Sequence, residues 1–464
     1  MSETSKRRDD LFYTRKNGYD LIDAKERAKS DAYCEEYKAF LDSSMTEREA
    51  VKTAIALAEK AGFKAFEPGR KLKAGDRVYY SNRGKAIMLA VIGKKDFGEG
   101  CVIAAAHVDS PRLDLKQLPL YESEELAFFK THYYGGIKKY QWTTIPLELH
   151  GVVALQDGSV VDVVIGRDES DPQFVITDLL PHLAADQLKK NAAEVVTGEQ
   201  LNLLIGSVPD AEEGKDRVKL AVLKLLEEKY GIREEDFLSA ELSAVPAYKA
   251  RDLGLDRSLI GAYGQDDRSC AFAELRAILD VKKPERSCVC IFADKEEIGS
   301  MGVSGMQSQA FEFFMGELCA MQGVELRRCF EKSVCISADV CAALDPNFPE
   351  VSEKRNNARV NYGVGIIKFT GSRGKSGSND ASAEVVGRVR KLLDGAGVAW
   401  QMGELGKVDQ GGGGTVAKFT AQRDIDTIDA GVPVLSMHAP FEVISKADLY
   451  MTYAAVKALY AAAI

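Results

Sequence analysis

Cys101-Val-Ile-Ala-Ala-Ala106, followed directly by His107, is the stretch that decides the fold class of this chain. An unbroken apolar run of this length is typical of a strand buried on both faces, and such strands form parallel sheets covered by helices. In an open α/β sheet, ligands bind beyond the carboxyl ends of the parallel strands. A histidine at that point therefore predicts an α/β fold and the place of its functional site.

Three further apolar runs also lead into residues that can bind a metal ion. They are residues 288–293 before Glu296 and Glu297, residues 333–338 before Asp339, and residues 432–437 before His438. If the four runs are neighbouring parallel strands, their ends bring these side chains to one edge of the sheet. The pattern predicts a hydrolytic metal enzyme.

Length and composition limit the class of protein. A chain of 464 residues is expected to form two domains, and a net charge of −9 argues against nucleic acid or an anionic membrane as the main partner. We find no apolar run of roughly 18 residues and no apolar stretch behind the charged N-terminus that would indicate a secretory signal. Nine cysteines without CxxC spacing indicate free thiols in a reducing compartment. We therefore expect a cytoplasmic protein.

The α/β pattern is interrupted in the middle of the chain. Thr46-Glu-Arg-Glu49 is a capping box that opens a helix over residues 50–61. Later, Asp157-Gly158 separates two strand-like runs and predicts a hairpin. We expect an α/β catalytic domain in two parts, residues 1–117 and 248–464, and an inserted, mostly β domain over residues 118–247.

Four helices are expected after residue 260, where the α/β pattern resumes. Asn379 or Asp380 can cap the third helix, and Ser445 can cap the fourth. The four helices are expected over residues 268–280, 309–322, 381–394 and 446–463.

His107-Val-Asp109 places two polar side chains on one face of an extended segment. A metal-bound imidazole commonly donates its other N–H group to a carboxylate. Asp109 is therefore expected to contribute to catalysis, either by accepting that N–H group from His107 or from a position behind His107. A surface His-x-Asp pair is the ordinary alternative, but the apolar run before His107 favours a strand end.

Asp266 and Asp267 lie just before a predicted helix. Either could simply cap that helix, but two cations held close together need a shared carboxylate to offset their repulsion. Asp266 is the candidate bridge, whereas Asp267, next to Arg268, is expected to be a cap or an ion-pair partner.

Adjacent carboxylates at Glu296 and Glu297 stand in a glycine-rich turn. One can bind a metal ion while the other acts as general base on water. A solvated acidic loop is the alternative. A glycosidase would also use two carboxylates, but it would leave both histidines without a role.

Asp339 and His438 complete the candidate metal ligands. A polar strand exit and a core histidine are the ordinary alternatives, although the other three histidines all fall in the inserted block. The glycines of Gly411-Gly-Gly-Gly414-Thr415 let the backbone approach a ligand closely, so Gly413, Gly414 and Thr415 are expected at the rim of the site.

In this order, these motifs resemble the M18 aminopeptidases, which belong to the di-zinc exopeptidases. The resemblance rests on Ala106-His-Val-Asp-Ser-Pro-Arg112, on Ser337-Ala-Asp-Val with Asp345-Pro-Asn-Phe348, and on Ser436-Met-His438. It covers most of the chain, and residues 370–380 are similar to a bacterial branch of the aspartyl aminopeptidases. It implies a three-layer catalytic domain of the phosphorylase/hydrolase-like fold and an inserted dimerisation domain.

The resemblance also implies a ligand set and an assembly. One metal ion would take His107 and Asp339, the other would take Glu297 and His438, and Asp266 would be shared. Glu296 would be the general base that activates a metal-bridging hydroxide. The family forms homododecamers built from dimers, in which a neighbouring subunit can send a histidine, here His182, into the active site.

The expected reaction is removal of an acidic or neutral N-terminal residue from peptides. Zinc is the expected metal, with manganese or cobalt as alternatives. Lys375 or Arg373 could attract an acidic substrate side chain. A related di-metal amidohydrolase or carboxypeptidase, and a catalytically silent cage subunit, are the competing interpretations.

Overall fold

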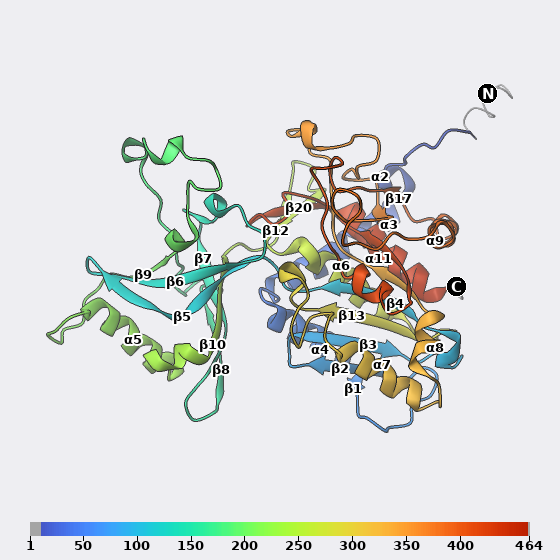
Figure 1. Cartoon of the computed structure of the whole chain (residues 1–464), viewed down its shortest axis with the longest axis horizontal. Coiled ribbons are helices and arrows are strands. Elements are labelled where there is room, and N and C mark those ends of the chain that lie inside the picture. The colour runs from blue at the N-terminus through green and yellow to red at the C-terminus, as the bar shows by residue number, and fades with distance from the viewer. Residues whose placement is uncertain (1–10, 463–464) are drawn as a thin grey trace.

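A nine-stranded mixed sheet forms the centre of the larger part of the molecule (Figure 1). The computed structural model describes residues 11–462. The strand order is β1-β2-β3-β13-β4-β14-β18-β16-β17, and β13, β4, β14 and β18 are mutually parallel. The bounds are β1 Lys64–Ala65, β2 Arg77–Asn82, β3 Ala86–Val91, β4 Val102–His107, β13 Cys288–Ala293, β14 Val334–Ser337, β16 Val364–Ile367, β17 Trp400–Met402 and β18 Asp426–Gly431.

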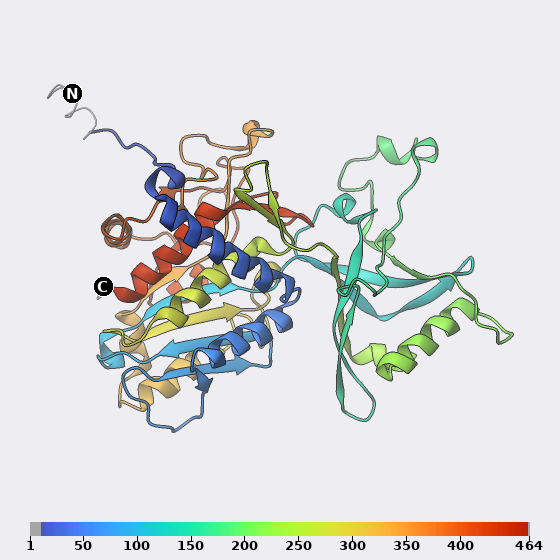
Figure 2. The same ribbon diagram turned by 180° about the vertical axis from the view of Figure 1, so that it is seen from behind.

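Helices cover both faces of this sheet, which confirms the three-layer arrangement. In β4, Val102 and Ala104 face one apolar core, while Ile103 and Ala105 face the other. This alternation between two cores is why the strand reads as one apolar run. Figure 2 shows α3, α6 and α11 across one face. The helices on that face are α3 Ala24–Asp42, α4 Glu47–Lys60, α6 Gln265–Asp280, α9 Ala383–Gly395 and α11 Lys446–Ala461. The helices on the opposite face are α7 Ala310–Ala320, α8 Leu326–Glu331 and α10 Ala417–Ala421.

The helix signals in the sequence are largely confirmed. Both hydrogen bonds of the Thr46–Glu49 capping box are present at the start of α4, and Ser445 caps α11. Ser382 caps α9, so the expectation of Asn379 or Asp380 was wrong, because the helix begins later than its apolar pattern suggested. Residues 1–10 and the expected end of the last helix at Ala463 lie outside the described residues.

A separate six-stranded antiparallel sheet carries α5 (Arg217–Tyr230) and lies beside the larger sheet (Figure 1). The predicted hairpin at Asp157-Gly158 is confirmed, since β7 pairs with β8 across it. Because β5 begins at Arg112, the expected boundary after residue 117 falls inside a strand. The order is β8 Val160–Ile165, β7 Leu147–Ala154, β10 Ala240–Pro246, β5 Arg112–Ser123, β6 Leu126–Tyr134 and β9 Leu203–Gly206.

The run before His438 belongs to a third, five-stranded sheet. The expectation that all four apolar runs are neighbours in one parallel sheet was therefore wrong for the fourth. The chain leaves the large sheet after β18, and β19 then pairs with β15 and β20. The order is β11 Arg251–Leu253, β12 Leu259–Ala262, β20 Glu442–Ser445, β19 Pro433–Leu435 and β15 Cys341–Ala342.

The cysteines and the lengths of the helices bear on two expectations from the composition. All nine cysteines are buried and free, as the sequence indicated. Within residues 11–462, every helix is too short or too polar to span a lipid bilayer.

Candidate active site

Three of the predicted ligand positions meet at the carboxyl edge of the large sheet. His107, the last residue of β4, is in register with Ala293 of β13, so the Glu296–Glu297 turn starts just beyond it. Ser337 of β14 is in register with Ala105, which places Asp339 level with His107. The register of the strands therefore brings together residues that are far apart in the sequence.

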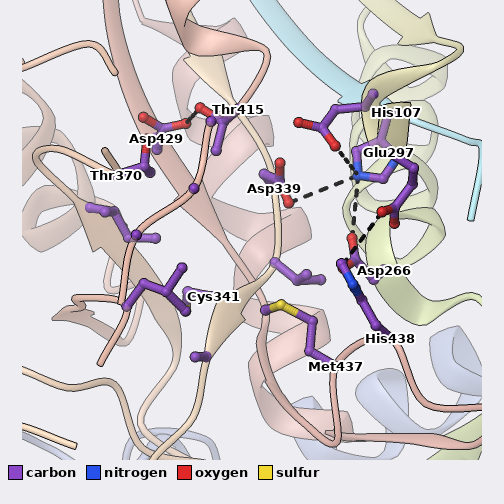
Figure 3. A pocket seen from close by; sticks show the side chains of 18 of the residues that line it. His107, Asp266, Glu297, Asp339, Cys341, Thr370, Thr415, Asp429, Met437 and His438 are labelled. Atoms are coloured by element: carbon purple, nitrogen blue, oxygen red, sulfur yellow. Dashed lines mark hydrogen bonds and ion pairs between the residues drawn. The ribbon is translucent and has the colours of Figure 1, made fainter. Parts of the chain in front are cut away.

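Asp266 lies between the two histidines (Figure 3). Its Oδ1 is 3.2 Å from Nε2 of His107, and its Oδ2 is 3.2 Å from Nε2 of His438. His438 reaches this position from the five-stranded sheet, and Asp266 from the start of α6. Each oxygen of one carboxylate thus faces a different imidazole, which is the arrangement that a bridging ligand requires.

The other three carboxylates surround this pair. Glu297 Oε2 is 3.5 Å from Nε2 of His438, and Asp339 Oδ1 is 4.0 Å from Nε2 of His107. Glu296 Oε2 lies 3.9 Å from the same His107 nitrogen. The structure therefore brings together all six residues of the predicted metal and general-base set.

The ring orientation of both histidines is fixed by backbone carbonyls. His107 Nδ1 donates to the carbonyl oxygen of Asp109 at 3.0 Å, and His438 Nδ1 donates to that of Gly136 at 2.8 Å. In each ring Nδ1 is thereby occupied, and Nε2, which faces Asp266, is the nitrogen that the neutral ring could offer to a metal ion. Gly136 was not found by sequence reasoning, because a carbonyl acceptor leaves no residue-type signal.

Asp109 lies behind the site, where its Oδ1 is 3.4 Å from Nδ1 of His107. Its two oxygens accept the backbone N–H groups of Glu296 and Glu297, at 3.1 and 3.2 Å. Tyr134 also donates its hydroxyl to Asp109 at 2.8 Å. Asp109 therefore holds the turn that carries both glutamates.

Two further buried carboxylates support the centre. Glu442 accepts the backbone N–H groups of His438 and Asp266, at 2.8 and 3.1 Å. Asp267 accepts the backbone N–H of His107 at 3.3 Å, so its expected role as a helix cap or a partner of Arg268 was wrong. Geometry alone groups Asp267 with His107 and Asp339 as a second possible cation site.

The donor set fits divalent cations. Ligand atoms about 2.0–2.1 Å from a tetrahedral zinc ion lie about 3.3 Å apart, close to the shortest separations between Asp266 and the two imidazoles. Oδ1 of Asp266 and Oε1 of Glu297 are buried without a hydrogen-bond partner. Buried polar atoms without partners are costly, and a cation would satisfy them.

Burial and crowding of the carboxyl groups also shift their pKa values. Burial raises the pKa of Glu296 to about 7, which is near the value that suits a general base. Burial and the nearby Asp267 carboxylate raise the pKa of Asp339 well above its usual range. So many buried carboxylates are held together most readily when cations offset their repulsion.

A cavity of about 480 Å³ opens beside this cluster. The predicted substrate contacts Gly413, Gly414 and Thr415 line it, and Thr415 donates to Asp429 at 2.6 Å. His182 is exposed on the segment that joins β8 to β9, outside this cavity. The glycine-rich stretch thus lies where the sequence placed it, whereas His182 is not brought to the site of its own chain.

Comparison with known proteins decides the family. Residues 40–460 match the family model described as aminopeptidase I zinc metalloprotease (M18). The chain belongs to the M18 aminopeptidase family. It is 50% identical over 453 residues to a probable M18 family aminopeptidase 1 of Clostridium acetobutylicum, covering 96% of this chain and 97% of that protein.

Solved structures agree with this assignment. The crystal structure of an M18 aminopeptidase from Thermotoga maritima superposes with a TM-score of 0.92 at 46% identity, covering 97% of this chain and 99% of the other. The dodecamer of mApe1 from yeast shares the fold, with a TM-score of 0.75 at 19% identity over 93% and 96% of the two chains. The chain is a metalloaminopeptidase of a zinc-dependent family.

Proposed function

We propose that this M18 aminopeptidase removes N-terminal residues with two divalent ions, zinc being the favoured metal. His107 and Asp339 would hold one ion, Glu297 and His438 would hold the other, and Asp266 would be shared. The observation that carries this proposal is the position of Asp266, whose two oxygens face the two imidazoles at 3.2 Å each. Bound ions would supply a water of lowered pKa and polarise the scissile carbonyl.

The protein's own groups then handle the proton and the substrate. Glu296, whose carboxylate lies 3.9 Å from Nε2 of His107, accepts a proton from water and returns it to the leaving amine. Asp109 keeps Glu296 and Glu297 oriented through their backbone N–H groups. The backbone of Gly413 and Gly414 lies along the cavity wall, where an extended peptide would enter.

A neutral N-terminal residue fits the cavity better than an acidic one. Val340, Ile367, Leu405 and Met437 line it, and among its described lining residues there is no lysine or arginine. Lys375, which could have attracted an acidic side chain, pairs with Asp380 at 3.0 Å instead. These features favour substrates such as leucyl peptides.

Self-association through the inserted sheet is the proposed assembly, with dimers building a homododecamer like that of yeast mApe1. Its support is the exposed apolar surface on the segment between β8 and β9, where Leu179, Leu183 and Leu188 are each more than half exposed. His182 is exposed on the same segment, and we propose that it enters the active site of a partner subunit. We propose residues 112–246 as the inserted domain, because its sheet spans that range.

One experiment tests the proposed chemistry. The protein is stripped with a chelator, reloaded separately with zinc, manganese or cobalt, and assayed with leucyl, aspartyl, glutamyl and N-acetyl-leucyl substrates. We expect two ions per chain, restored cleavage of the leucyl substrate and rejection of the acetylated one. Full activity with only one bound ion per chain would refute the two-ion site. Cleavage of the acetylated substrate would favour an amidohydrolase. No cleavage by the metal-loaded protein would indicate a catalytically silent subunit.

A further inference from the structure

Three consecutive residues at the end of β6 contact three different groups of the active site. Tyr134 donates its hydroxyl to Asp109 Oδ2 at 2.8 Å, and the carbonyl oxygen of Gly136 accepts from Nδ1 of His438 at 2.8 Å. Between them, Gly135 lies against Glu297. Tyr134 is the last residue of β6 in the six-stranded sheet, and Gly135 and Gly136 follow it directly. The 134–136 segment nevertheless touches the turn, a histidine and a carboxylate of the catalytic centre.

The hydroxyl of Tyr134 acts on the catalytic turn through Asp109. The carboxylate of Asp109 is fully buried and accepts three donors: this hydroxyl and the two glutamate N–H groups. Water does not reach the carboxylate to replace a lost donor, so each hydrogen bond is costly to remove. Burial raises the pKa of Tyr134 far above its ordinary value, so the group stays a donor at any working pH.

The ring of Tyr134 is held independently of its hydroxyl. The Arg112 guanidinium lies over the ring, 4.1 Å from its centroid. Arg112 itself donates to Asp114 at 2.7 Å and to Glu47 at 3.0 Å. A phenylalanine at this position therefore keeps the ring in place and removes only the hydrogen bond to Asp109.

Gly135 leaves room for the carboxylate of Glu297. Its φ of +73° is a conformation that other residues rarely adopt, and a Cβ there would lie 3.2 Å from Glu297 Oε2. A side chain at this position would press on the glutamate that faces His438. The absence of a side chain is thus part of the geometry of the site.

We propose that the 134–136 segment is a positioning element of the active site, with Tyr134 as its positioning residue, so that the six-stranded sheet orients the catalytic turn. The inference rests on the ligand set proposed above. Its physical basis is that supporting hydrogen bonds fix the orientation of ligands, and their loss typically costs about 10–100-fold in metal affinity or activity.

Tyr134→Phe is the direct test, and Tyr133→Phe is its matched control. Tyr133 undergoes the same chemical change, but its side chain points to the opposite face of β6 and is 41% exposed. For Tyr134→Phe we expect kcat to fall about 10-fold or more with KM within about twofold, and zinc affinity, measured by competition with a chelator, to fall about 10-fold. Tyr133→Phe should match the wild type in both measurements.

Asp109→Asn and the double variant test the route of the effect. Because Tyr134 acts through Asp109, adding Tyr134→Phe to Asp109→Asn should lower kcat no further. The inference would be overturned if Tyr134→Phe kept the wild-type kcat and zinc affinity. It would also be overturned if Tyr133→Phe lost as much kcat and zinc affinity as Tyr134→Phe, or if the two losses of kcat multiplied in the double variant. If Asp109→Asn alone retains full activity, the role proposed for Asp109 fails instead.

Gly135→Ala provides an independent measurement should Tyr134→Phe fail to fold. It leaves the tyrosine hydroxyl in place and adds one methyl group beside Glu297. We expect zinc affinity to fall about 10-fold or more. Unchanged zinc affinity in a folded Gly135→Ala protein would overturn the positioning role of the segment.

Discussion

Glu296→Gln is expected to separate the proposed general base from the proposed metal ligands. The substitution preserves the shape of the side chain and removes its ability to accept a proton. The backbone N–H of residue 296, which Asp109 holds at 3.1 Å, is unaffected. Because the turn keeps its anchor and Glu297 keeps its place near His438, the metal site should survive.

The size of the effect follows from the position of the carboxylate. Glu296 Oε2 is 3.9 Å from His107 Nε2, which places its carboxylate beside the proposed metal site. Loss of a positioned base typically costs about 10²–10⁴-fold in rate. At about 1.36 kcal/mol per tenfold, this corresponds to about 3–5 kcal/mol of transition-state stabilisation.

Two measurements on the same preparation check this prediction. We expect kcat for a leucyl substrate to fall by about 10²–10⁴-fold, with zinc content by mass spectrometry equal to the wild type. Glu297→Gln is the matched control and should lose bound zinc. Zinc loss in Glu296→Gln with retention in Glu297→Gln would reverse the two roles and refute the reasoning.

Two further predictions concern stability away from the catalytic centre. Burial lowers the pKa of His150, but the interactions of its ring with Glu148 and Glu49 outweigh burial and raise the pKa above 6.5. The charged ring therefore stabilises the folded protein below pH 6.5. This stabilisation is lost as the pH rises through the pKa of the folded state. His150→Gln should therefore lower the midpoint of thermal unfolding more at pH 6 than at pH 9, and an equal loss at both would contradict the charge argument. Thr46→Ala removes the N-cap of α4 and should destabilise the protein by about 1 kcal/mol, measured by urea unfolding. Thr53→Ala is the comparison: this half-buried residue of the same helix caps no helix end, and the substitution removes only its hydrogen bonds with Ser43, so it should cost less.

Local sequence signals were enough to find most of the candidate site. The apolar runs before His107, Glu296 and Asp339 each form a strand of the large sheet, because a strand buried on both faces must be apolar throughout. The capping box at Thr46 and the Asp157-Gly158 turn were also readable, since they depend on a few adjacent residues.

Some residues were misplaced or missed because their roles depend on distant partners. An apolar run does not reveal which sheet it joins, so the strand before His438 was assigned to the wrong one. Asp267 was expected to be a cap, although its carboxylate turns inward to the backbone of His107. Glu442 stands alone in its segment and gave no motif at all.

The sequence by itself thus determined the layered α/β architecture, the M18 resemblance and the residue types that gather at the strand ends, because each is written in short apolar patterns and motifs. Only the tertiary structure decided how these residues are oriented. The hydroxyl of Tyr134 comes from a strand of a different sheet, and the carbonyl oxygen of Gly136 comes from the turn just after that strand. Backbone acceptors carry no residue identity, and contacts between separate sheets leave no local periodicity, so no pattern along the chain could have predicted them.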